Sequence, residues 1–434
     1  MIIVDAALRE LEASGSPIRV GLVGAGFMAQ GLANQIVNSV PGMRLVAVSG
    51  RRLERAADVV RYAGREPLAV DSAGALDAAI ARGETAITTD ALLLCRSSGV
   101  DVVVEATGAV EYATHVVLEA FVHGKDVVLM NAELDATIGP ILQTRARDHG
   151  VIMSACDGDE PGVQLNLVRW VRGLGLIPRV VGNVKGLQDP YRNPTTQRGF
   201  AERWGQNPAM VTSFADGTKI SCEQAIVANA TGFKVLQRGM SRGREFRELP
   251  EKLPELYLPM LDEIRAQGGI IDYTVGTIGT KVYVLAEHAD PKQRHYLELY
   301  KMGPGPLYAF WVPYHLVHFE VPNAIARVRL FRDPLAPPLG GPVVEVCAVA
   351  KRDLVRGETL DGYGQYMTYG EAVNTEEMRG ERYVPEGLVE DCVLRRDIRR
   401  DEVIRYDDVE LPAGRLADEL RAEQYRYFAG AHQT

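Results

Sequence analysis

Short apolar runs alternate with segments whose apolar residues recur every three or four positions over the first part of the chain. The apolar runs are typical of strands buried on both faces, and the recurring segments are typical of helices. Strands are expected over residues 18–26, 43–50, 100–108, 125–132 and 151–159, and helices over residues 3–14, 29–39, 53–64, 111–124, 138–150 and 162–175. This alternation predicts a doubly wound parallel sheet with right-handed crossovers.

The pattern changes near residue 178, where shorter amphipathic runs rich in aromatic residues, asparagine, glycine and proline begin. Asp216-Gly217 lies between two such runs, which predicts a β-hairpin around this pair. Residues 331–342 are rich in proline and glycine and predict a linker. The fold class is therefore α/β, with a parallel-sheet domain over residues 1–177, an α+β domain over 178–333 and a small β-rich domain over 334–434.

The last of these domains contains a short internal repeat. Residues 349–360 align with residues 393–404 at an offset of 44, and eight positions match in kind. Each copy predicts a strand, a polar turn and a return to extended chain. Two such units packed together give a small β-rich module, for which we expect a structural or oligomerisation role.

Composition excludes several classes of protein. The net charge of −9 over 434 residues argues against a nucleic-acid partner, which normally requires a basic surface. The five cysteines show no CxxC spacing, which predicts reduced thiols in a cytoplasmic protein. The first residues show no signal-peptide pattern, and no apolar run approaches the roughly 18 residues of a membrane span, so no membrane partner is expected.

A glycine motif follows the first expected strand and opens the first helix of the alternating region. In Gly24-x-Gly26-x-x-Ala29, the first glycine permits a tight turn and the second lets the backbone approach a diphosphate, while the alanine allows close helix–strand packing. The free amides at this helix N-terminus, including those of Phe27 and Met28, favour negative charge. The motif therefore predicts a dinucleotide site; a tight turn without a cofactor is the alternative.

The end of the second strand distinguishes the two nicotinamide dinucleotides. An acidic residue there binds the ribose hydroxyls of NAD, whereas this chain has Ser49, Gly50, Arg51 and Arg52. Two guanidiniums are suited to a 2′-phosphate, so we expect NADP (NADPH) in preference to NAD. The alternative is that both arginines are ordinary solvated residues at a helix start.

Two later strands also end in residues that can face the cofactor. Thr107 and Gly108 end one strand, at the place where the nicotinamide ribose lies in such folds. Asn131 and Ala132 end the next strand, where Asn131 can contact the nicotinamide or its ribose. Glu133 can exchange a proton with a substrate, or it can be a first-turn helix residue favoured by the helix dipole.

With these pieces the chain resembles the homoserine-dehydrogenase-like oxidoreductases, on the dinucleotide motif, "EATG" and the Asn-Ala pair. The lysine that follows this pair in homoserine dehydrogenases is replaced by Glu133, which argues against homoserine as substrate. A closer resemblance is to the subgroup with a C-terminal SAF-type domain, on "GDEPG", "ANATG", "KMGPGPLYAFWVPYHL" and "EVCAVAKRDL".

One branch of this subgroup is the type II 1-deoxy-D-xylulose 5-phosphate reductoisomerase-like proteins, which rearrange and reduce a phosphorylated ketose with NADPH. Residues 185–208 depart from that branch, so the substrate stays open. The resemblance implies a dinucleotide-binding domain, a catalytic and oligomerisation domain, a SAF-like domain and a homo-oligomer, either dimer or tetramer.

Hydride transfer to a carbonyl requires a proton donor and positive charge near the oxygen. Lysines suit both roles, since burial lowers the pKa of an ammonium towards neutrality. Asp159 and Glu160 lie at a strand end, where they can relay a proton or bind a divalent metal; a helix N-cap is the alternative. The candidate catalytic residues are Lys185, Lys301, Asp159, Glu160 and Glu133.

Candidate substrate contacts lie in the second region. Asn229 and Thr231 can bind hydroxyl or phosphate oxygens, and Asp272 can form a proton-handling pair with Tyr273. Tyr314 and His315 follow a proline close to the glycine-rich segment of Lys301. For each of these, an ordinary structural role in a strand, turn or helix is the alternative.

The sequence is consistent with two functions, one of an enzyme and one of a binding protein. The first is an NADP-dependent oxidoreductase acting on a small polyhydroxylated or phosphorylated carbonyl substrate, with a coupled rearrangement on a divalent metal as its more specific form. The second is a non-catalytic NADP-binding sensor whose C-terminal module signals to a partner.

Overall fold

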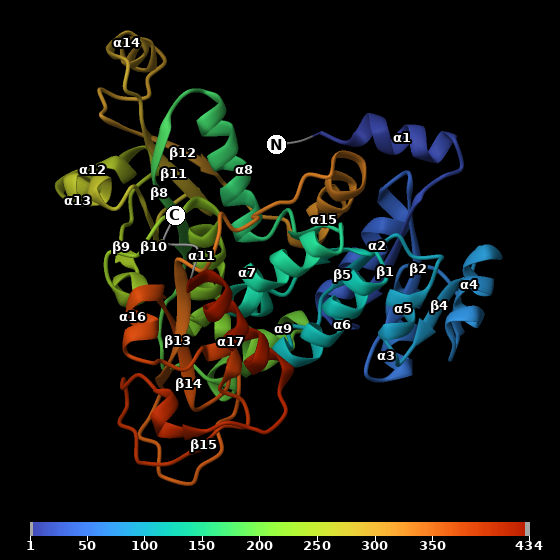
Figure 1. The fold of residues 1–434 in the computed structure, drawn as a ribbon. Helices are drawn as coiled ribbons and strands as arrows, with labels where there is room; N and C mark the ends of the chain where they lie inside the picture. The colour runs from blue at the N-terminus through green and yellow to red at the C-terminus, as the bar shows by residue number, and fades with distance from the viewer. Residues whose placement is uncertain (1–2, 430–434) are drawn as a thin grey trace.

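The computed structural model describes residues 3–429 and contains two main sheets (Figure 1). The first is fully parallel and has seven strands in the order β3-β4-β2-β1-β5-β6-β7. Its strands are β1 (Ile18–Val23), β2 (Met43–Ser49), β3 (Pro67–Ala69), β4 (Thr85–Thr88), β5 (Val102–Glu105), β6 (Asp126–Leu129) and β7 (Met153–Ala155). The strand order reverses between β1 and β5, which makes the crevice beyond their carboxyl ends the ligand-binding position of such a sheet.

Helices cover both faces of this sheet, as the alternating pattern predicts. One face packs against α4 (Ala73–Ala81), α5 (Leu92–Arg96), α6 (Val110–Val122) and α7 (Ala132–Asp148). The other packs against α1 (Asp5–Ala13), α2 (Phe27–Ser39), α3 (Leu53–Tyr62) and, from later in the chain, α15 (Val317–Ala326). The elements β3, α4, β4 and α5 were not expected, because their apolar runs are short.

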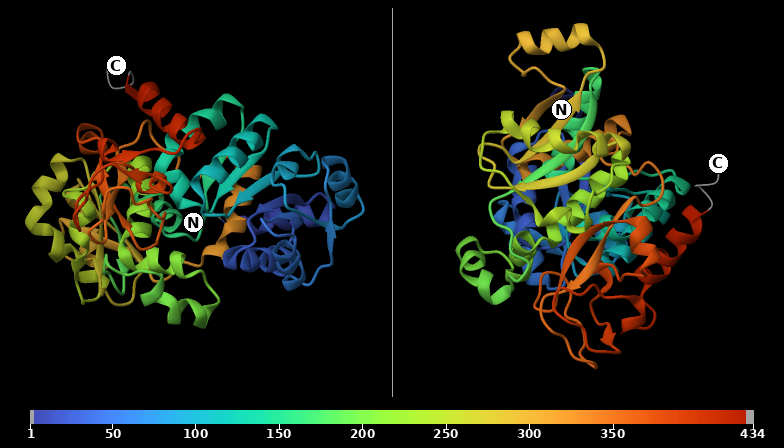
Figure 2. Two further views of the ribbon diagram at one scale, coloured as in Figure 1. Left: turned by 90° about the horizontal axis from the view of Figure 1, so that it is seen from below. Right: turned by 90° about the vertical axis from the view of Figure 1, so that its left-hand side faces the viewer.

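The second sheet is mixed and has the order β12-β11-β8-β10-β9. Its strands are β8 (Ile177–Lys185), β9 (Arg244–Glu245), β10 (Ile270–Val275), β11 (Val282–Glu287) and β12 (Leu307–Val312). One face carries α8 (Glu160–Gly173) and α11 (Thr218–Thr231), and the other carries α12 (Leu253–Tyr257) and α13 (Leu261–Ala266). The remaining helices of this part are α9 (Pro194–Trp204), α10 (Pro208–Asp216) and α14 (Pro291–Leu299), the last of which projects from the rest of the chain (Figures 1 and 2).

The expected hairpin around residues 211–221 is wrong, because this stretch forms α10 and α11. Gly217 adopts a left-handed conformation with φ of 97° and joins the two helices in place of a hairpin turn. Every residue of α11 is buried, since the helix lies between the second sheet, α7, α8 and the C-terminal strands. Because the helix is buried on all sides, no solvent-exposed polar face marks the helical period in its sequence.

The C-terminal module lies beside the second sheet, away from the N-terminal strands (Figures 1 and 2). It contains the antiparallel pairs β13 (Val344–Ala350) with β14 (Thr368–Asn374) and β15 (Val393–Leu394) with β16 (Val409–Glu410), and the helices α16 (Thr375–Gly380) and α17 (Leu416–Ala429).

The internal repeat is visible in this module as reciprocal contacts between the two copies. Asp353 accepts a hydrogen bond from the amide of Arg400 at 2.9 Å. Asp397, its counterpart in the second copy, accepts one from the amide of Arg356 at 2.8 Å. The two copies therefore pack face to face with an approximate two-fold relation.

Other expectations are met or stay open. All five cysteines are unpaired and buried, and no helix within residues 3–429 is long and apolar enough to cross a membrane. The domain boundaries at 177 and 333 stay predictions, and packing assigns α8 to the second sheet and α15 to the first.

Candidate active site

A cleft of about 700 Å³ lies beyond the carboxyl ends of β1, β2 and β5. One wall comes from the first domain and the other from the segment that joins α9 to α10 and from α10 itself. The residues that line it are Val23, Gly24, Ala25, Gly26, Phe27, Met28, Gln30, Ser49, Gly50, Arg51, Arg52, Arg55, Ala106, Thr107, Ala109, Tyr112, Gly205, Gln206, Asn207, Met210 and Phe214. Most of the expected cofactor contacts therefore face one cavity.

The glycine motif has the geometry that a dinucleotide requires. Gly24 has φ of 118°, and a Cβ there would lie 2.8 Å from the carbonyl oxygen of Ala106, so a side chain is excluded. A Cβ on Gly26 would meet no protein atom within 4 Å, because this position faces the open cleft. Ala29 is buried against the sheet and does not line the cleft. The space above Gly26 and the amides of α2 is therefore free for a diphosphate.

The far end of the cleft is basic. Arg51, Arg52 and Arg55 all line it, and the third was not among the expected contacts. The hydroxyl of Ser49 is buried there and has no hydrogen-bond partner among the described residues. A buried hydroxyl without a partner is costly, and a ligand oxygen in the cleft can satisfy it. These residues fit the adenosine end of a dinucleotide.

Glu105, at the end of β5, connects the cleft to the neighbouring strand. One carboxylate oxygen accepts hydrogen bonds from the amide and the hydroxyl of Thr107, and the other accepts one from Asn131 Nδ2 at 2.8 Å. Asn131 in turn caps α7 through the amide of Leu134. Asn131 and Ala132 therefore lie behind the cleft wall, whereas a Cβ on Gly108 would lie 3.3 Å from Met210 of the opposite wall.

Glu105 also makes stability depend on pH. Burial raises the pKa of Glu105 from 4.5 to about 7, although Thr107 and Asn131 partly oppose this. Between pH 4.5 and about 7 the folded chain therefore binds more protons than the unfolded chain. The free energy of unfolding falls as pH rises through this range, by an amount on the order of 3 kcal/mol.

Glu105→Gln is expected to remove this contribution and flatten the pH dependence. Urea unfolding of the unmodified and variant proteins at pH values across the window measures the difference between them. If the free energy of unfolding changes equally with pH in the two proteins, Glu105 does not titrate in this range.

A cluster of charged side chains lies beyond β6 and β7, where the first domain meets α11. Lys219 of α11 places its Nζ 3.8 Å from a carboxylate oxygen of Glu133 and 3.8 Å from one of Asp159. Both distances exceed hydrogen-bond range, and Glu133 Oε1 has no hydrogen-bond partner among the described residues. Asp159 occupies the N-cap of α8, but its side chain makes no cap hydrogen bond. The ammonium hydrogens of Lys219 are therefore available to a substrate oxygen.

The second half of the cluster surrounds Lys185, at the end of β8. Its Nζ donates to Glu160 at 3.2 Å and to Glu223 of α11 at 3.4 Å. Asn183 donates a further hydrogen bond to Glu223 at 3.2 Å. His315 Nδ1 lies 3.4 Å from Glu160. The cluster thus joins residues from α7, α8, α11, β8 and the segment before α15.

Burial and charge set the protonation of the cluster. Burial acts against the charged form of Lys219, but Glu133 and Asp159 outweigh it and hold its pKa well above the ordinary value. The expectation of a lowered lysine pKa is therefore wrong here, because the carboxylates outweigh burial. The pKa of Lys185 is also raised, by Glu223 and Glu160. Both lysines stay protonated at neutral pH.

The carboxyl groups of the cluster differ in the direction in which their surroundings shift the pKa. Burial raises the pKa of Asp159, with Lys219 partly opposing the shift. Burial and the charge of Glu160 raise that of Glu223 well above its usual range. Lys185 and His315 outweigh the burial of Glu160 and hold its pKa well below the usual range. Glu160 is therefore a permanent anion, while Asp159 can exchange a proton.

Asp159, Glu160 and His315 offer three ligand atoms that lie within 4.8 Å of one another, the one such metal-binding group within residues 3–429. Carboxylate oxygens and an imidazole nitrogen form a chemically reasonable donor set for a divalent cation. Glu160 Oε1 already accepts a hydrogen bond from Lys185 Nζ at 3.2 Å. A cation there would therefore compete with Lys185 for the same carboxylate.

Several expected residues lie elsewhere. Lys301 is exposed, follows the projecting α14, and forms no ion pair among the described residues, so we exclude it from the site. Tyr314 is also exposed. Asp272 is buried, pairs with Arg244 at 2.5 Å and accepts the amide of Tyr273, which gives it a structural role.

Asn229 and Thr231 also have structural roles. Asn229 Oδ1 accepts hydrogen bonds from the amides of Val343 and Val344 at 2.7 and 3.1 Å and so holds the start of β13 against α11. The hydroxyl of Thr231 donates to the carbonyl of Val227 within the same helix. Neither side chain is expected to contact substrate.

Sequence reasoning missed two residues of the cluster, Lys219 and Glu223. Both lie in α11, which was interpreted as strand and turn. Their spacing of four residues places both on one face of a helix, but only a helical interpretation reveals that face.

Two family models match the chain, each over less than half of it. The model for the NAD binding domain of homoserine dehydrogenase matches residues 20–154. The model for the catalytic domain of oxidoreductase DRL matches residues 158–321. Among curated proteins, a homoserine dehydrogenase of Pseudomonas aeruginosa is 30% identical over 168 residues, or 36% of this chain. The match spans 35% of the length of that relative.

Solved structures show more distant likeness. A myo-inositol dehydrogenase from Lactobacillus casei in complex with NAD(H) and myo-inositol has a TM-score of 0.30 and 18% identity, over 41% of this chain and 49% of that one. A probable dehydrogenase from Thermotoga maritima has a TM-score of 0.40 and 12% identity, over 74% of this chain and 91% of that one.

Proposed function

We propose that this chain, an NAD(P)-binding oxidoreductase of the dehydrogenase type, transfers hydride between NADP(H) and a small polyhydroxylated or phosphorylated carbonyl compound. A reduction coupled to rearrangement, of the 1-deoxy-D-xylulose 5-phosphate reductoisomerase type, is the more specific form of this proposal. The single observation that supports it is the position of the charged cluster on the same sheet edge as the cofactor cleft.

The strand order explains this position. The cleft lies over the ends of β1, β2 and β5, and the cluster lies beyond β6 and β7. Neighbouring strands are about 4.8 Å apart, so the diphosphate turn after β1 and the residues after β7 are about 15 Å apart along the edge. A dinucleotide bound at Gly26 is long enough to extend towards the cluster. The hydrogen bonds that Thr107 and Asn131 donate to Glu105 run along the same sheet edge, from the cleft towards the cluster.

The residues of the cluster have distinct roles in this proposal. When bound, the nicotinamide supplies or accepts hydride at the substrate carbon. The ammonium of Lys219 donates hydrogen bonds to the substrate oxygen and stabilises its developing negative charge. Asp159, whose raised pKa permits proton exchange near neutrality, delivers or removes the proton. Lys185, fixed by Glu160 and Glu223, orients a neighbouring substrate hydroxyl.

Preference for NADP(H) is expected to depend on the basic end of the cleft. The double variant Arg51→Ala, Arg52→Ala removes two guanidiniums, each able to contribute a charge-assisted hydrogen bond to a 2′-phosphate. The Kd for NADPH is therefore expected to rise by about 10- to 100-fold, with little change for NADH. Calorimetric titration measures both constants.

Arg61→Ala is a matched control on α3, since Arg61 is exposed but does not line the cleft. Its affinity for both cofactors is expected to stay unchanged. Equal losses for NADPH and NADH in the double variant would contradict a 2′-phosphate site.

The oxidoreductase proposal is tested by following NADPH absorbance with a panel of aldoses, ketoses and their phosphates. We expect sustained oxidation with at least one member. Tight NADPH binding with no oxidation across the panel would favour the sensor function instead. Repeating the active assay after chelation tests the metal group: retained turnover assigns the chemistry to the lysines, and loss restored by a divalent cation assigns it to a metal at Asp159, Glu160 and His315.

A further inference from the structure

The first turn of α11, which carries Lys219, is in direct contact with strand β14 of the C-terminal module. The amide of Gly370 donates to Thr218 Oγ1 at 2.9 Å. The carbonyl of Gly370 accepts from the hydroxyl of Ser221 at 3.1 Å. These two hydrogen bonds flank Lys219 on its own helix. A Cβ on Gly370 would lie 2.6 Å from Val346 of the neighbouring strand and 3.1 Å from Thr218 of the helix, so a side chain at this position would crowd both.

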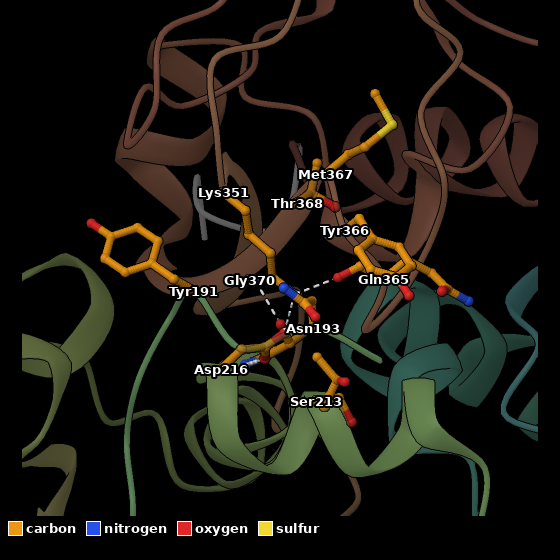
Figure 3. Close-up of polar contacts among 12 residues, drawn as sticks. Tyr191, Asn193, Ser213, Asp216, Lys351, Gln365, Tyr366, Met367, Thr368 and Gly370 are labelled. Carbon is orange, nitrogen blue, oxygen red and sulfur yellow. Dashed lines mark hydrogen bonds and ion pairs between the residues drawn. The ribbon is translucent and has the colours of Figure 1, made fainter. Parts of the chain in front are cut away.

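A buried ion pair holds Asp216, the last residue of α10, just before this turn (Figure 3). Lys351 of the module points towards Asp216, with Nζ 2.7 Å from Oδ2, and both side chains are almost completely buried. Lys351 also donates to the carbonyl of Gln365 at 2.7 Å. The other oxygen of Asp216 accepts the amide of Thr218 at 2.9 Å. Lys351 therefore fixes the carboxylate that accepts a hydrogen bond from the first amide of α11.

A second carboxyl group lies close to this ion pair, and burial raises the pKa of Asp216 although Lys351 partly opposes the shift. Glu386 lies nearby, accepts the hydroxyl of Thr368 at 3.0 Å and is buried. Burial and the charge of Asp216 raise the pKa of Glu386 well above its usual range. Asp216 therefore has Lys351 as its cationic partner.

We propose that the C-terminal module is a positioning element for the active site, which holds the ammonium of Lys219 in place through Gly370 and the Lys351–Asp216 pair. This inference rests on the proposed function, since it assigns the module a role in the reaction of the same site. Lys351, Asp216 and Gly370 act through α11 and do not touch substrate. Because misplacing a catalytic group by about 1 Å can cost about 100-fold in rate, small movements of this turn are sufficient to affect turnover.

The repeat supplies a matched control. Arg395 is the counterpart of Lys351 in the second copy, but it is exposed, and its side chain forms no hydrogen bond or ion pair among the described residues. Lys351→Met and Arg395→Met thus change equivalent positions of the module, and only the first loosens α11. Ser221→Ala is a milder variant that removes a single hydrogen bond between the module and the helix.

Hydrogen–deuterium exchange of the full chain and steady-state kinetics together test the inference. In Lys351→Met we expect faster exchange confined to the first turn of α11, kcat lower by about 100-fold, and an unchanged Kd for NADPH. Ser221→Ala is expected to show the same pattern at smaller size, and Arg395→Met to match the unmodified protein. A merely structural role would raise exchange throughout the chain.

Three results would overturn the inference: unchanged exchange in α11 of Lys351→Met, kcat unchanged despite faster exchange, or faster exchange spread evenly over the chain in both Lys351→Met and Ser221→Ala. Failure of the proposed function would give a different experimental result. The unmodified protein would then oxidise no NADPH with any compound of the panel, while the exchange measurement would still decide whether the module holds α11.

Discussion

Lys219→Met is expected to lower kcat by about 1000-fold and to leave the Kd for NADPH within about twofold of the unmodified protein. The reason lies in the position of the ammonium. Its Nζ lies 3.8 Å from both Glu133 and Asp159, too far for hydrogen bonds, so its hydrogens are free to stabilise charge on a substrate oxygen. Methionine has a similar length but offers no donor. Steady-state kinetics and calorimetric titration of NADPH measure the two effects separately.

The variant is expected to fold, because burial already raises the pKa of Asp159 and this carboxyl group can take up a proton once the ammonium is gone. Lys281→Met is the control, since Lys281 is exposed on the second sheet and lies outside the cluster. Its kcat is expected to stay unchanged. A kcat for Lys219→Met within a few-fold of the unmodified protein would remove Lys219 from the mechanism.

Gly26→Val is expected to abolish measurable NADPH binding while leaving stability within about 1 kcal/mol. The Cβ at this position would meet no protein atom within 4 Å, so the valine enters the cleft and not the core. There it occupies the space in which the diphosphate approaches the amides of α2. Calorimetric titration measures the loss of binding, and urea unfolding measures the stability.

Gly74→Val is the matched control, because Gly74 also has open space around its Cβ position but lies in α4, away from the cleft. It is expected to bind NADPH normally. Normal binding in Gly26→Val as well would show that the cofactor does not lie over the glycine turn.

Much of the first domain could be predicted from the sequence, because its physical signals are local. Strands buried on both faces produce apolar runs, and Gly24 and Gly26 mark the turn by side chains that are absent. Arg55 lines the cleft beside Arg51 because all three arginines follow β2, but the sequence alone did not separate it from an ordinary helix surface.

The catalytic cluster was only partly predictable, since tertiary packing assembles it. Lys185 ends β8, and Asp159 and Glu160 begin α8 shortly after β7, so the position of all three could be inferred from the pattern of strands. Lys219 and Glu223 lie on α11, whose burial on every side hides the helical period. Lys301 was expected on the basis of a glycine-rich segment, but that segment follows the projecting α14 and lies away from the site.

A structure of the NADPH complex tests most directly whether the glycine turn and the lysine cluster serve one reaction. The account predicts the diphosphate on the amides above Gly26, the 2′-phosphate between Arg51 and Arg52, and the nicotinamide ring beyond Thr107 facing Lys219. A ring directed away from Lys219, or a cofactor bound outside the cleft, would contradict it.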